Sequence, residues 1–448
     1  MRYLYACLAL LLATRVAYAE DIAEIVVEEN TKTTSDTVIL VSKVEVGDAW
    51  TPDMTEEIKR NLVSSGLFKD VEVFTEPAKK GGVKVHILAK DKHSWVIAPA
   101  LYNQPTNKGG GLGFGENNLF GLNQKLLLYG QIATGDSFFI GAWIIPAIGG
   151  TRFSAQFDTF LKTARNIEYA APTKWIEKKA RPIRESRIHY LNGGFKLGMG
   201  LFGGARIEAR LRAAKVSYVK DDLEYRGENG RVADLELPDD ASPIPEPGKE
   251  GWDVSNEWTL TVDRRANWYG VQSGYKFTAI YETALPSLGS DFHYQLATAS
   301  LFRAWQVLAR HNFIFKGGLN YGNNLPFQQE FKTGGTSMRG YLNDQFRGNF
   351  KASLNLEYSV PLFTVFGLSI RGLAFLDSAY TTFTKVSNEE RNYLPNSDAR
   401  GLDPFRNSVG VGTRFYLRQI VLPLLGLDVG YGLEARDVQV YLAIGLTD

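Results

Sequence analysis

The sequence predicts an all-β transmembrane barrel of sixteen antiparallel strands, preceded by one small α+β domain. Three observations predict it: an N-terminal export signal, no later apolar run long enough for a spanning helix, and segments of about ten residues with alternating polarity through most of the chain. The composition agrees, because 12% aromatic residues and 44 glycines favour strands and turns over helices.

Charge and cysteine content exclude several classes of protein. Lys and Arg number 50 against 49 Asp and Glu, so no basic field indicates a nucleic-acid partner. A single cysteine and five scattered histidines predict neither a disulfide framework nor a metal centre. We therefore expect no cofactor and no metal site.

Residues 1–19 have the pattern of a signal peptide. Arg2 supplies the positive charge, residues 8–13 are apolar, and Ala17-Tyr18-Ala19 is a small-residue cleavage site. The alternative, an uncleaved anchor helix, is disfavoured because the apolar stretch is too short to span a bilayer. Cleavage would also remove Cys7, the only cysteine.

Residues 20–91 predict a small domain with the order strand, helix, helix, strand, strand. The strands are expected at 22–29, 71–74 and 83–87, and the first helix at 35–43. Thr51 is expected to cap the second helix, with Pro52 in its first turn and Gly66 as its stop.

In residues 92–448, apolar and polar side chains alternate with a period of two residues. Along residues 205–212, Ala and aliphatic side chains occupy one parity and four charged side chains the other, which only a strand collects on one face. Sixteen strands are predicted, at 94–101, 109–116, 123–133, 137–145, 151–160, 187–197, 205–216, 253–263, 274–283, 292–305, 310–320, 349–358, 367–377, 406–418, 424–432 and 438–446.

Loop length separates a barrel from a soluble sandwich, which would alternate in the same way. The four long connections, at 161–186, 217–252, 321–348 and 378–405, all follow odd-numbered strands. Short turns at one barrel end and long loops at the other are typical of outer-membrane barrels. The parity therefore favours a barrel.

The first domain resembles a POTRA domain, the periplasmic module of outer-membrane assembly factors. The likeness rests on Gly47-Asp48, the second helix and the run SGLFKDV at 65–71. The barrel resembles the BamA-type superfamily, which includes BamA and TamA. Its motifs are GGTSMRGY at 334–341, EYSVP at 357–361, FLD at 375–377 and NLFG at 118–121.

This resemblance implies a luminal site. In the family, the loop with the R-G-F/Y motif folds into the barrel and its Arg meets acidic residues on the inner wall. Arg339, Gly340 and Tyr341 match that motif, and Glu357 and Asp377 are expected to anchor it. A guanidinium in a lumen needs such carboxylate partners. The alternative is an Arg339 in solvent at the loop tip.

The resemblance also implies a weak lateral seam between the first and last strands. Residues expected there are Trp95, Ile97, Val440, Leu442 and Ile444. The chain ends in residues 443–448 without the terminal aromatic that is usual in the family.

Two functions remain open from the sequence, and neither is enzymatic. The first is a monomeric assembly factor of the bacterial outer membrane. It would receive unfolded outer-membrane proteins at a periplasmic POTRA domain and insert them into lipid at the seam, with accessory lipoproteins as further expected partners. The second is a dedicated polypeptide translocation pore, as in two-partner secretion, which the single POTRA copy favours. A lipase or protease barrel is disfavoured because no G-x-S-x-G motif is present.

Overall fold

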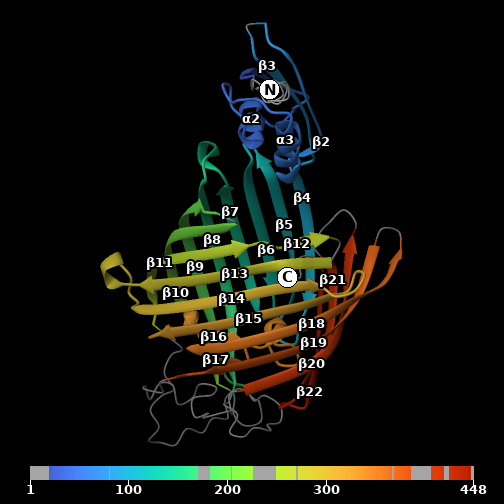
Figure 1. The fold of residues 1–448 in the computed structure, drawn as a ribbon. Coiled ribbons are helices and arrows are strands. Elements are labelled where there is room, and N and C mark those ends of the chain that lie inside the picture. The colour runs from blue at the N-terminus through green and yellow to red at the C-terminus, as the bar shows by residue number, and fades with distance from the viewer. Residues whose placement is uncertain are drawn as a thin grey trace, which may run out of the picture. The chain divides into compact units, whose positions relative to one another are not determined.

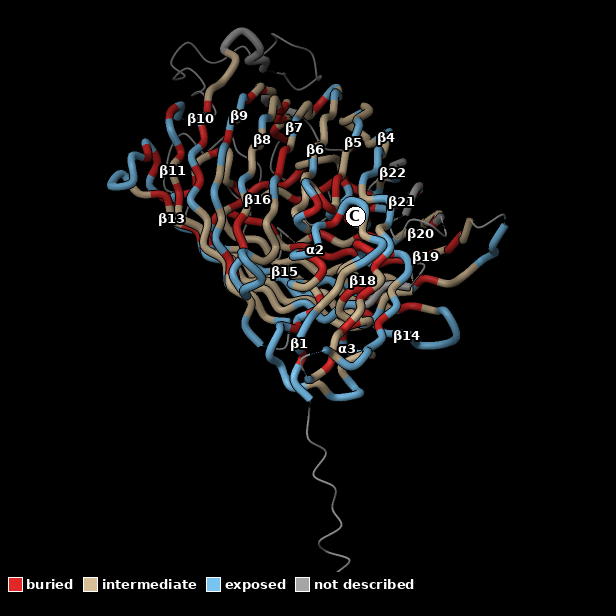
Figure 2. The backbone as a smooth tube through the Cα atoms, turned by 90° about the horizontal axis from the view of Figure 1, so that it is seen from above, coloured by how far each residue is buried: buried red, intermediate tan, exposed pale blue. Residues whose placement is uncertain are grey.

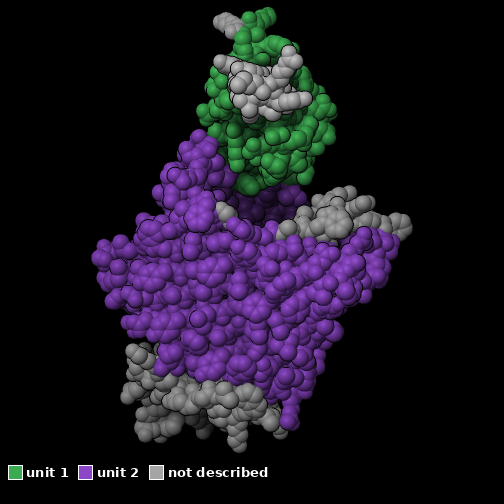
Figure 3. Space-filling view, in the orientation of Figure 1, with its two compact units in different colours: residues 1–95, 116–125 green, residues 96–115, 126–448 purple. Residues whose placement is uncertain are grey.

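The structure is a computed structural model that describes residues 20–79, 81–169, 182–202, 204–225, 249–268, 271–365, 368–384, 405–417 and 423–444. The predicted signal at 1–19 lies outside the described residues. The chain forms two compact units, one from residues 1–95 and 116–125 and the other from residues 96–115 and 126–448 (Figure 3). None of the helices in the described ranges is long and apolar enough to cross a membrane.

The N-terminal unit contains two helices and a three-stranded sheet. Its elements are β1 (Ile22–Glu28), α2 (Ser35–Ser42), α3 (Asp53–Ser64), β2 (Phe68–Pro77) and β3 (Val83–Asp91). The strand order is β1-β3-β2, with β1 parallel and β2 antiparallel to β3. The core is apolar: Val38, Ile58, Leu62, Val85 and Ile87 are fully buried. The expected element order is therefore present.

The start of α3 differs from the prediction. Thr51 does not cap the helix, because Pro52 occupies the cap position and makes no side-chain bond. The carbonyl of Thr51 instead accepts the Met54 N–H in a preceding turn. Gly66 follows the helix with φ of +74°, a conformation that glycine adopts without strain.

The turn at residues 116–125 groups with the N-terminal unit because it bonds to the β1–α2 connection. Lys32 forms an ion pair with Glu116 at 2.8 Å, and the Asn118 amide donates to the Thr33 hydroxyl at 2.7 Å. A Cβ on Gly121 would lie 2.1 Å from the carbonyl oxygen of Lys32, so this close approach requires glycine.

The second unit is a closed barrel (Figure 1). Its strands are β4 (Trp95–Asn103), β5 (Lys108–Leu119), β6 (Gln124–Ala133), β7 (Asp136–Ile145), β8 (Phe153–Tyr169), β9 (Pro182–Gly200), β10 (Ala205–Tyr225), β11 (Gly251–Asp263), β12 (Ala266–Trp268), β13 (Val271–Ala284), β14 (Tyr294–Gln306), β15 (Asn312–Asn323), β18 (Phe350–Val365), β19 (Leu368–Thr382), β20 (Phe405–Leu417), β21 (Pro423–Gly432) and β22 (Asp437–Ile444). Three-residue β12 pairs beside β13, and the others form the predicted sixteen-stranded antiparallel wall, which is confirmed.

Burial alternates along the wall strands, as the colours of Figure 2 show. Leu191 and Leu211 are each 54% exposed, whereas the intervening parity holds Asn192 and Arg212, each 6% exposed. The barrel is thus apolar outside and polar inside, the pattern of a wall that faces lipid.

Strands β8, β9 and β10 are longer than predicted. β10 continues to Tyr225 and β8 to Tyr169, well beyond the predicted ends at 216 and 160. Past the lipid-facing band, the outer parity no longer has to be apolar, so the alternation fades although the hydrogen-bonded ladder continues.

The connection from β15 to β18 is folded rather than extended. It contains the turns η3 (Phe327–Gln329) and η4 (Gly335–Ser337) and a short hairpin of β16 (Phe331–Thr333) with β17 (Phe346–Gly348). We call residues 324–349 the luminal loop, because its side chains contact inward-facing residues of strands on several sides of the barrel.

Candidate functional site

The first part of the site is the buried guanidinium of Arg339, which is 4% exposed. Its Nε and Nη2 donate to the two oxygens of Asp377 at 2.8 and 2.7 Å, and its backbone N–H adds a third bond at 3.1 Å. Nη1 lies 2.9 Å from Glu357, and the guanidinium stacks 3.5 Å from the ring centre of Phe375. The structure thus brings Arg339 together with Glu357 and Asp377.

A third carboxylate and a second guanidinium complete this cluster. Asp428 on β21 lies 3.4 Å from Arg339 and accepts two bonds from Arg414 on β20, at 2.6 and 2.8 Å. Burial would lower the pKa of Arg339, but its hydrogen bonds to Asp377 and the charges of all three carboxylates raise it instead. Arg339 therefore stays charged, and its loss would leave buried carboxylates without their partner.

Gly340 and Tyr341 fit the loop against the last strands. Gly340 has φ of +103°, and a Cβ there would lie 2.6 Å from the backbone nitrogen of Gly432 on β21. The Tyr341 hydroxyl donates to Glu434 and, at 3.1 Å, to the carbonyl of Asn407. Only glycine permits the close contact of Gly340 with Gly432. The bonds to Glu434 and Asn407 satisfy the buried hydroxyl of Tyr341.

The second part of the site is the seam between β22 and β4. Over the described residues, which end at 444, three residue pairs close it: Leu442 with Asn103, Ala443 with Tyr102 and Ile444 with Leu101. β21 and β22 share eight pairs. Each pair contributes ladder hydrogen bonds, so over the described residues this closure is weaker than the β21–β22 pairing.

The five predicted seam residues divide into two groups. Leu442 and Ile444 lie in the pairs that close the barrel. Trp95 and Ile97 lie earlier on β4, and Val440 pairs with Val429 of β21. Trp95, Ile97 and Val440 are about half exposed and belong to the outer apolar surface. Residues 445–448, including the non-aromatic end of the chain, lie outside the described residues.

The luminal loop also bonds to residues on both sides of the seam. The Tyr441 hydroxyl on β22 donates to the Tyr341 carbonyl at 2.6 Å and accepts the Gly340 N–H at 3.0 Å. The Asn343 amide donates to Gln104, directly after β4. A cavity of about 290 Å³ beside these contacts is lined by Tyr441 together with Arg339 and its charged neighbours. The charge cluster around Arg339 and the β4–β22 seam are therefore one connected site.

A family model for the Omp85 superfamily domain matches residues 118–436, about seven-tenths of the chain. The chain belongs to the Omp85 superfamily. This confirms the superfamily resemblance, and it makes the protein a bacterial outer-membrane barrel of a family whose members act in assembly and transport rather than as enzymes.

Several solved structures share the fold of this chain at low sequence identity. BamA from Haemophilus ducreyi lacking POTRA domains 1–3 has a TM-score of 0.68 and 15% identity, covering 95% of this chain and 84% of that one. CdiB from Acinetobacter baumannii scores 0.64 at 16% identity, covering 96% and 74%, and CdiB from Escherichia coli scores 0.64 at 13%, covering 96% and 77%. No curated protein matches the sequence.

Sequence reasoning missed several members of this Omp85 site. Asp428, Arg414, Gln104 and Tyr441 reach it only because the strand register places them at the level of the loop. Parity could have assigned Arg414 and Asp428 to the lumen, but a shift of register would have changed which side chains meet. In the described ranges, no group of three His, Cys, Asp or Glu side chains has a metal-binding arrangement.

Proposed function

We propose that this Omp85 protein assembles outer-membrane proteins by inserting their strands at the β4–β22 seam. The observation that carries the proposal is the short closure: over the described residues, three residue pairs join β4 and β22, whereas β21 and β22 share eight. Opening it would expose two strand edges in lipid, where unpaired backbone groups are costly. An incoming client strand would satisfy those edges.

The N-terminal unit is proposed as a single periplasmic POTRA domain at residues 20–91. Its strand–helix–helix–strand–strand order supports this, and the sheet order β1-β3-β2 leaves β2 at an edge. An edge strand can accept an extended client by strand addition. The partners are then unfolded outer-membrane proteins and the surrounding lipid, and accessory lipoproteins would be recruited separately.

Locking the seam tests this mechanism directly. Asn103 and Leu442 are paired partners, and antiparallel partners lie close enough for a disulfide. Cells would be depleted of the wild-type protein and supplied with Asn103→Cys/Leu442→Cys. The matched control is Val429→Cys/Val440→Cys, a pair one strand away.

We expect the locked seam to abolish assembly of outer-membrane barrels until a reductant is added, while the control lock has no effect. Folded barrels would be counted in isolated outer membranes. Full function of the locked protein would contradict the insertion mechanism.

The alternative function is a dedicated translocation pore, and the fold similarity to the two CdiB structures favours it. The same depletion separates the two functions. A loss across unrelated barrels supports a general assembly factor, whereas the loss of one secreted or surface protein alone supports the translocator.

A further inference from the structure

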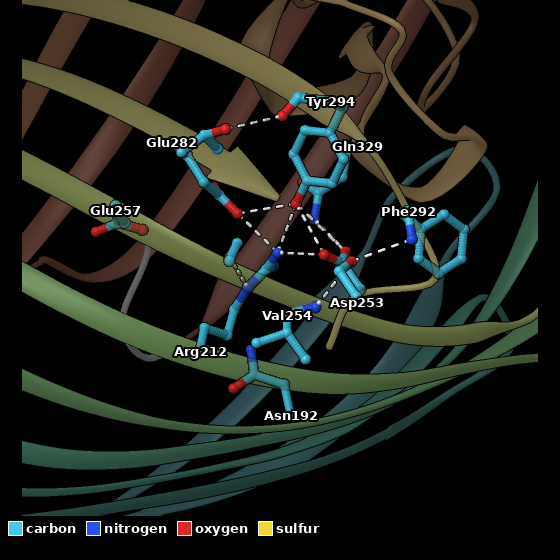
Figure 4. A network of polar contacts seen from close by, with 12 residues as sticks. Asn192, Arg212, Asp253, Val254, Glu257, Glu282, Phe292, Tyr294 and Gln329 are labelled. Atoms are coloured by element: carbon cyan, nitrogen blue, oxygen red, sulfur yellow. Dashed lines mark hydrogen bonds and ion pairs between the residues drawn. The ribbon is translucent and has the colours of Figure 1, made fainter. Parts of the chain in front are cut away.

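Arg212 of β10 shows how a cation inside the barrel is neutralised (Figure 4). Its Nη2 donates to Glu282 at 2.7 Å and to Asp253 at 3.1 Å, and also to the Tyr294 hydroxyl at 2.7 Å. Arg212 donates to the Tyr190 hydroxyl as well, so its partners come from β9, β11, β13 and β14. A guanidinium that is removed from water needs such negative partners.

Arg303 of β14 lies on the other, outward-facing side of the wall. It shares the parity of Leu301 and Trp305, each 41% exposed, whereas Ala304 between them is buried. The Arg303 guanidinium lies 5.7 Å from the ring centre of Tyr275 and 5.3 Å from that of Trp305. Among the described residues, no carboxylate forms an ion pair with it. Its negative partner therefore has to come from outside the chain.

The position of Arg303 along β14 indicates where that partner lies. The strand ends at Gln306, three residues later, where the short turn to β15 begins. A cation on the lipid-facing side of a barrel is costly at the bilayer midplane and tolerated near the interface, where aromatic girdles also lie. Arg303, Tyr275 and Trp305 therefore mark the level of the lipid headgroups at this end of the barrel.

The turn beyond Arg303 is apolar although it is exposed. Val307 and Leu308 are 55% and 59% exposed, and Leu362 and Phe363 near the end of β18 are exposed to a similar extent. Exposed apolar patches mark contacts with a membrane or with a partner protein. These side chains continue the lipid-facing surface of β14 and β18, so lipid is the occupant that this continuity favours.

A second patch of the same kind lies at the turns from β7 to β8 and from β9 to β10. Phe202 is 86% exposed, and Ile148 and Leu201 are also exposed. Arg152 is exposed as well, and its carbonyl accepts the Gly200 N–H at 2.8 Å, which places the two turns side by side. The described parts of both turns, 146–152 and 201–204 without 203, contain no acidic residue. Apolar and basic side chains thus occur together twice at this end of the barrel.

We call these two patches the short-turn rim, which comprises Ile148, Arg152, Leu201 and Phe202 in the first and Arg303, Val307 and Leu308 in the second. We propose that the short-turn rim binds anionic phospholipids of the membrane leaflet on its side. The apolar side chains enter the boundary between headgroups and acyl chains, and Arg152 and Arg303 bind the phosphates. Lipid binding at the rim goes beyond the proposed function and does not depend on which client or passenger the protein handles.

A fluorescent reporter at each patch tests the proposal. Leu308→Cys and Phe202→Cys are used one at a time in the full chain with Cys7→Ser, folded into lipid nanodiscs, and each carries a nitrobenzoxadiazole dye. Leu288→Cys, at an exposed leucine in the β13–β14 turn at the opposite end of the barrel, is the reporter control. The nanodiscs are phosphatidylcholine with a small fraction of phosphatidylglycerol or phosphatidylcholine that carries a quenching nitroxide near its headgroup.

We expect phosphatidylglycerol to quench positions 308 and 202 as if enriched about fivefold over phosphatidylcholine, the factor that one basic side chain near an anionic surface gives. Position 288 should show no such preference. Arg303→Gln should remove the preference at 308 and leave it at 202, and Arg152→Gln should do the reverse. Lys215→Gln, which removes the lysine that stacks on Trp252 of the outer surface, is the matched control and should change neither.

Equal quenching of positions 308 and 202 by the two lipids would overturn the proposal. Quenching by aqueous iodide but not by either lipid would also overturn it, because the turns would then lie in water or be reserved for a protein partner. High salt gives a test in the wild-type rim that needs no charge variant. It should weaken the preference for phosphatidylglycerol, while quenching by phosphatidylcholine persists; a preference that salt leaves unchanged would contradict binding through Arg152 and Arg303.

Discussion

The N-terminal unit and the barrel bury opposite kinds of side chain. In the first, the fully buried residues are aliphatic, such as Val38, Ile58 and Leu62. In the second, fully buried positions include Arg347 and Asp377, while large aliphatic side chains lie on the outside. Water drives the first arrangement through the hydrophobic effect, whereas lipid accepts the apolar outer face of the second. The barrel interior is consequently held by backbone ladders and paired charges.

Removing one charge from the barrel interior should have the largest effect. Arg339→Ala leaves Asp377 and Glu357 buried without their shared cation, and we expect it to destabilise the barrel by about 3–5 kcal/mol. The temperature at which the folded band is lost in a semi-native gel measures this. Arg206→Ala, which removes a more exposed guanidinium on β10, is the control. Equal melting temperatures of the wild type and Arg339→Ala would show that the buried charges do not hold the loop.

A cavity in the N-terminal core should come next. Ile58→Ala deletes a fully buried side chain, and we expect a loss of about 2–4 kcal/mol confined to that unit. Thermal unfolding followed by limited proteolysis reports the N-terminal unit, and the gel assay reports the barrel. Val63→Ala, on the exposed side of α3, should leave both unchanged. An equal fall in the melting temperature of the barrel in Ile58→Ala would contradict the independence of the two units.

A charged side chain of the N-terminal unit, Asp91, is held by backbone hydrogen bonds and not by a buried cation as in the barrel. The Asp91 carboxylate accepts the backbone N–H groups of Thr31, Lys32 and Thr33. Burial would raise the pKa of Asp91, but these bonds and the Thr33 hydroxyl outweigh it and lower the pKa. The stabilisation is therefore present above the unfolded pKa of about 3.9 and is lost as pH falls through the folded value.

We expect Asp91→Asn to cost about 1–2 kcal/mol at neutral pH and to make unfolding of this unit less sensitive to acid. Melting at pH 7 and at pH 3 measures both. Asp70→Asn, an exposed position on β2, is the control. An undiminished acid dependence in Asp91→Asn would assign the effect to other carboxylates.

The smallest effect is expected at the seam. Tyr441→Phe removes the two bonds between β22 and the luminal loop while keeping the ring, and should cost about 1 kcal/mol. Tyr431→Phe, on the outer face of β21, is the matched control. Both variants would be compared by gel melting and by the thiol reactivity of a cysteine at Asn103. If Tyr441→Phe leaves that reactivity unchanged, the loop does not help to close the seam.

Local patterns in the sequence predicted most of the fold because they repeat with the period of each element. The alternation along residues 205–212 placed Arg212 inside and Leu211 outside, and Gly66 marked the end of α3. The cap at Thr51 was wrong, because the choice between adjacent cap positions depends on tertiary packing around the turn. The ends of β8 and β10 were set too early, because alternation weakens outside the lipid band.

The sequence by itself determined the strands, their inward and outward faces, the motif at Arg339–Tyr341 and the two acids Glu357 and Asp377 that meet it. Only the tertiary structure decided that Asp428 and Arg414 join this cluster, that Leu442 pairs with Asn103 across the seam, and that Arg212 gathers partners from four other strands. The physical reason is register. Alternation assigns a side chain to a face, but the sliding of one strand against the next determines which side chains meet across it.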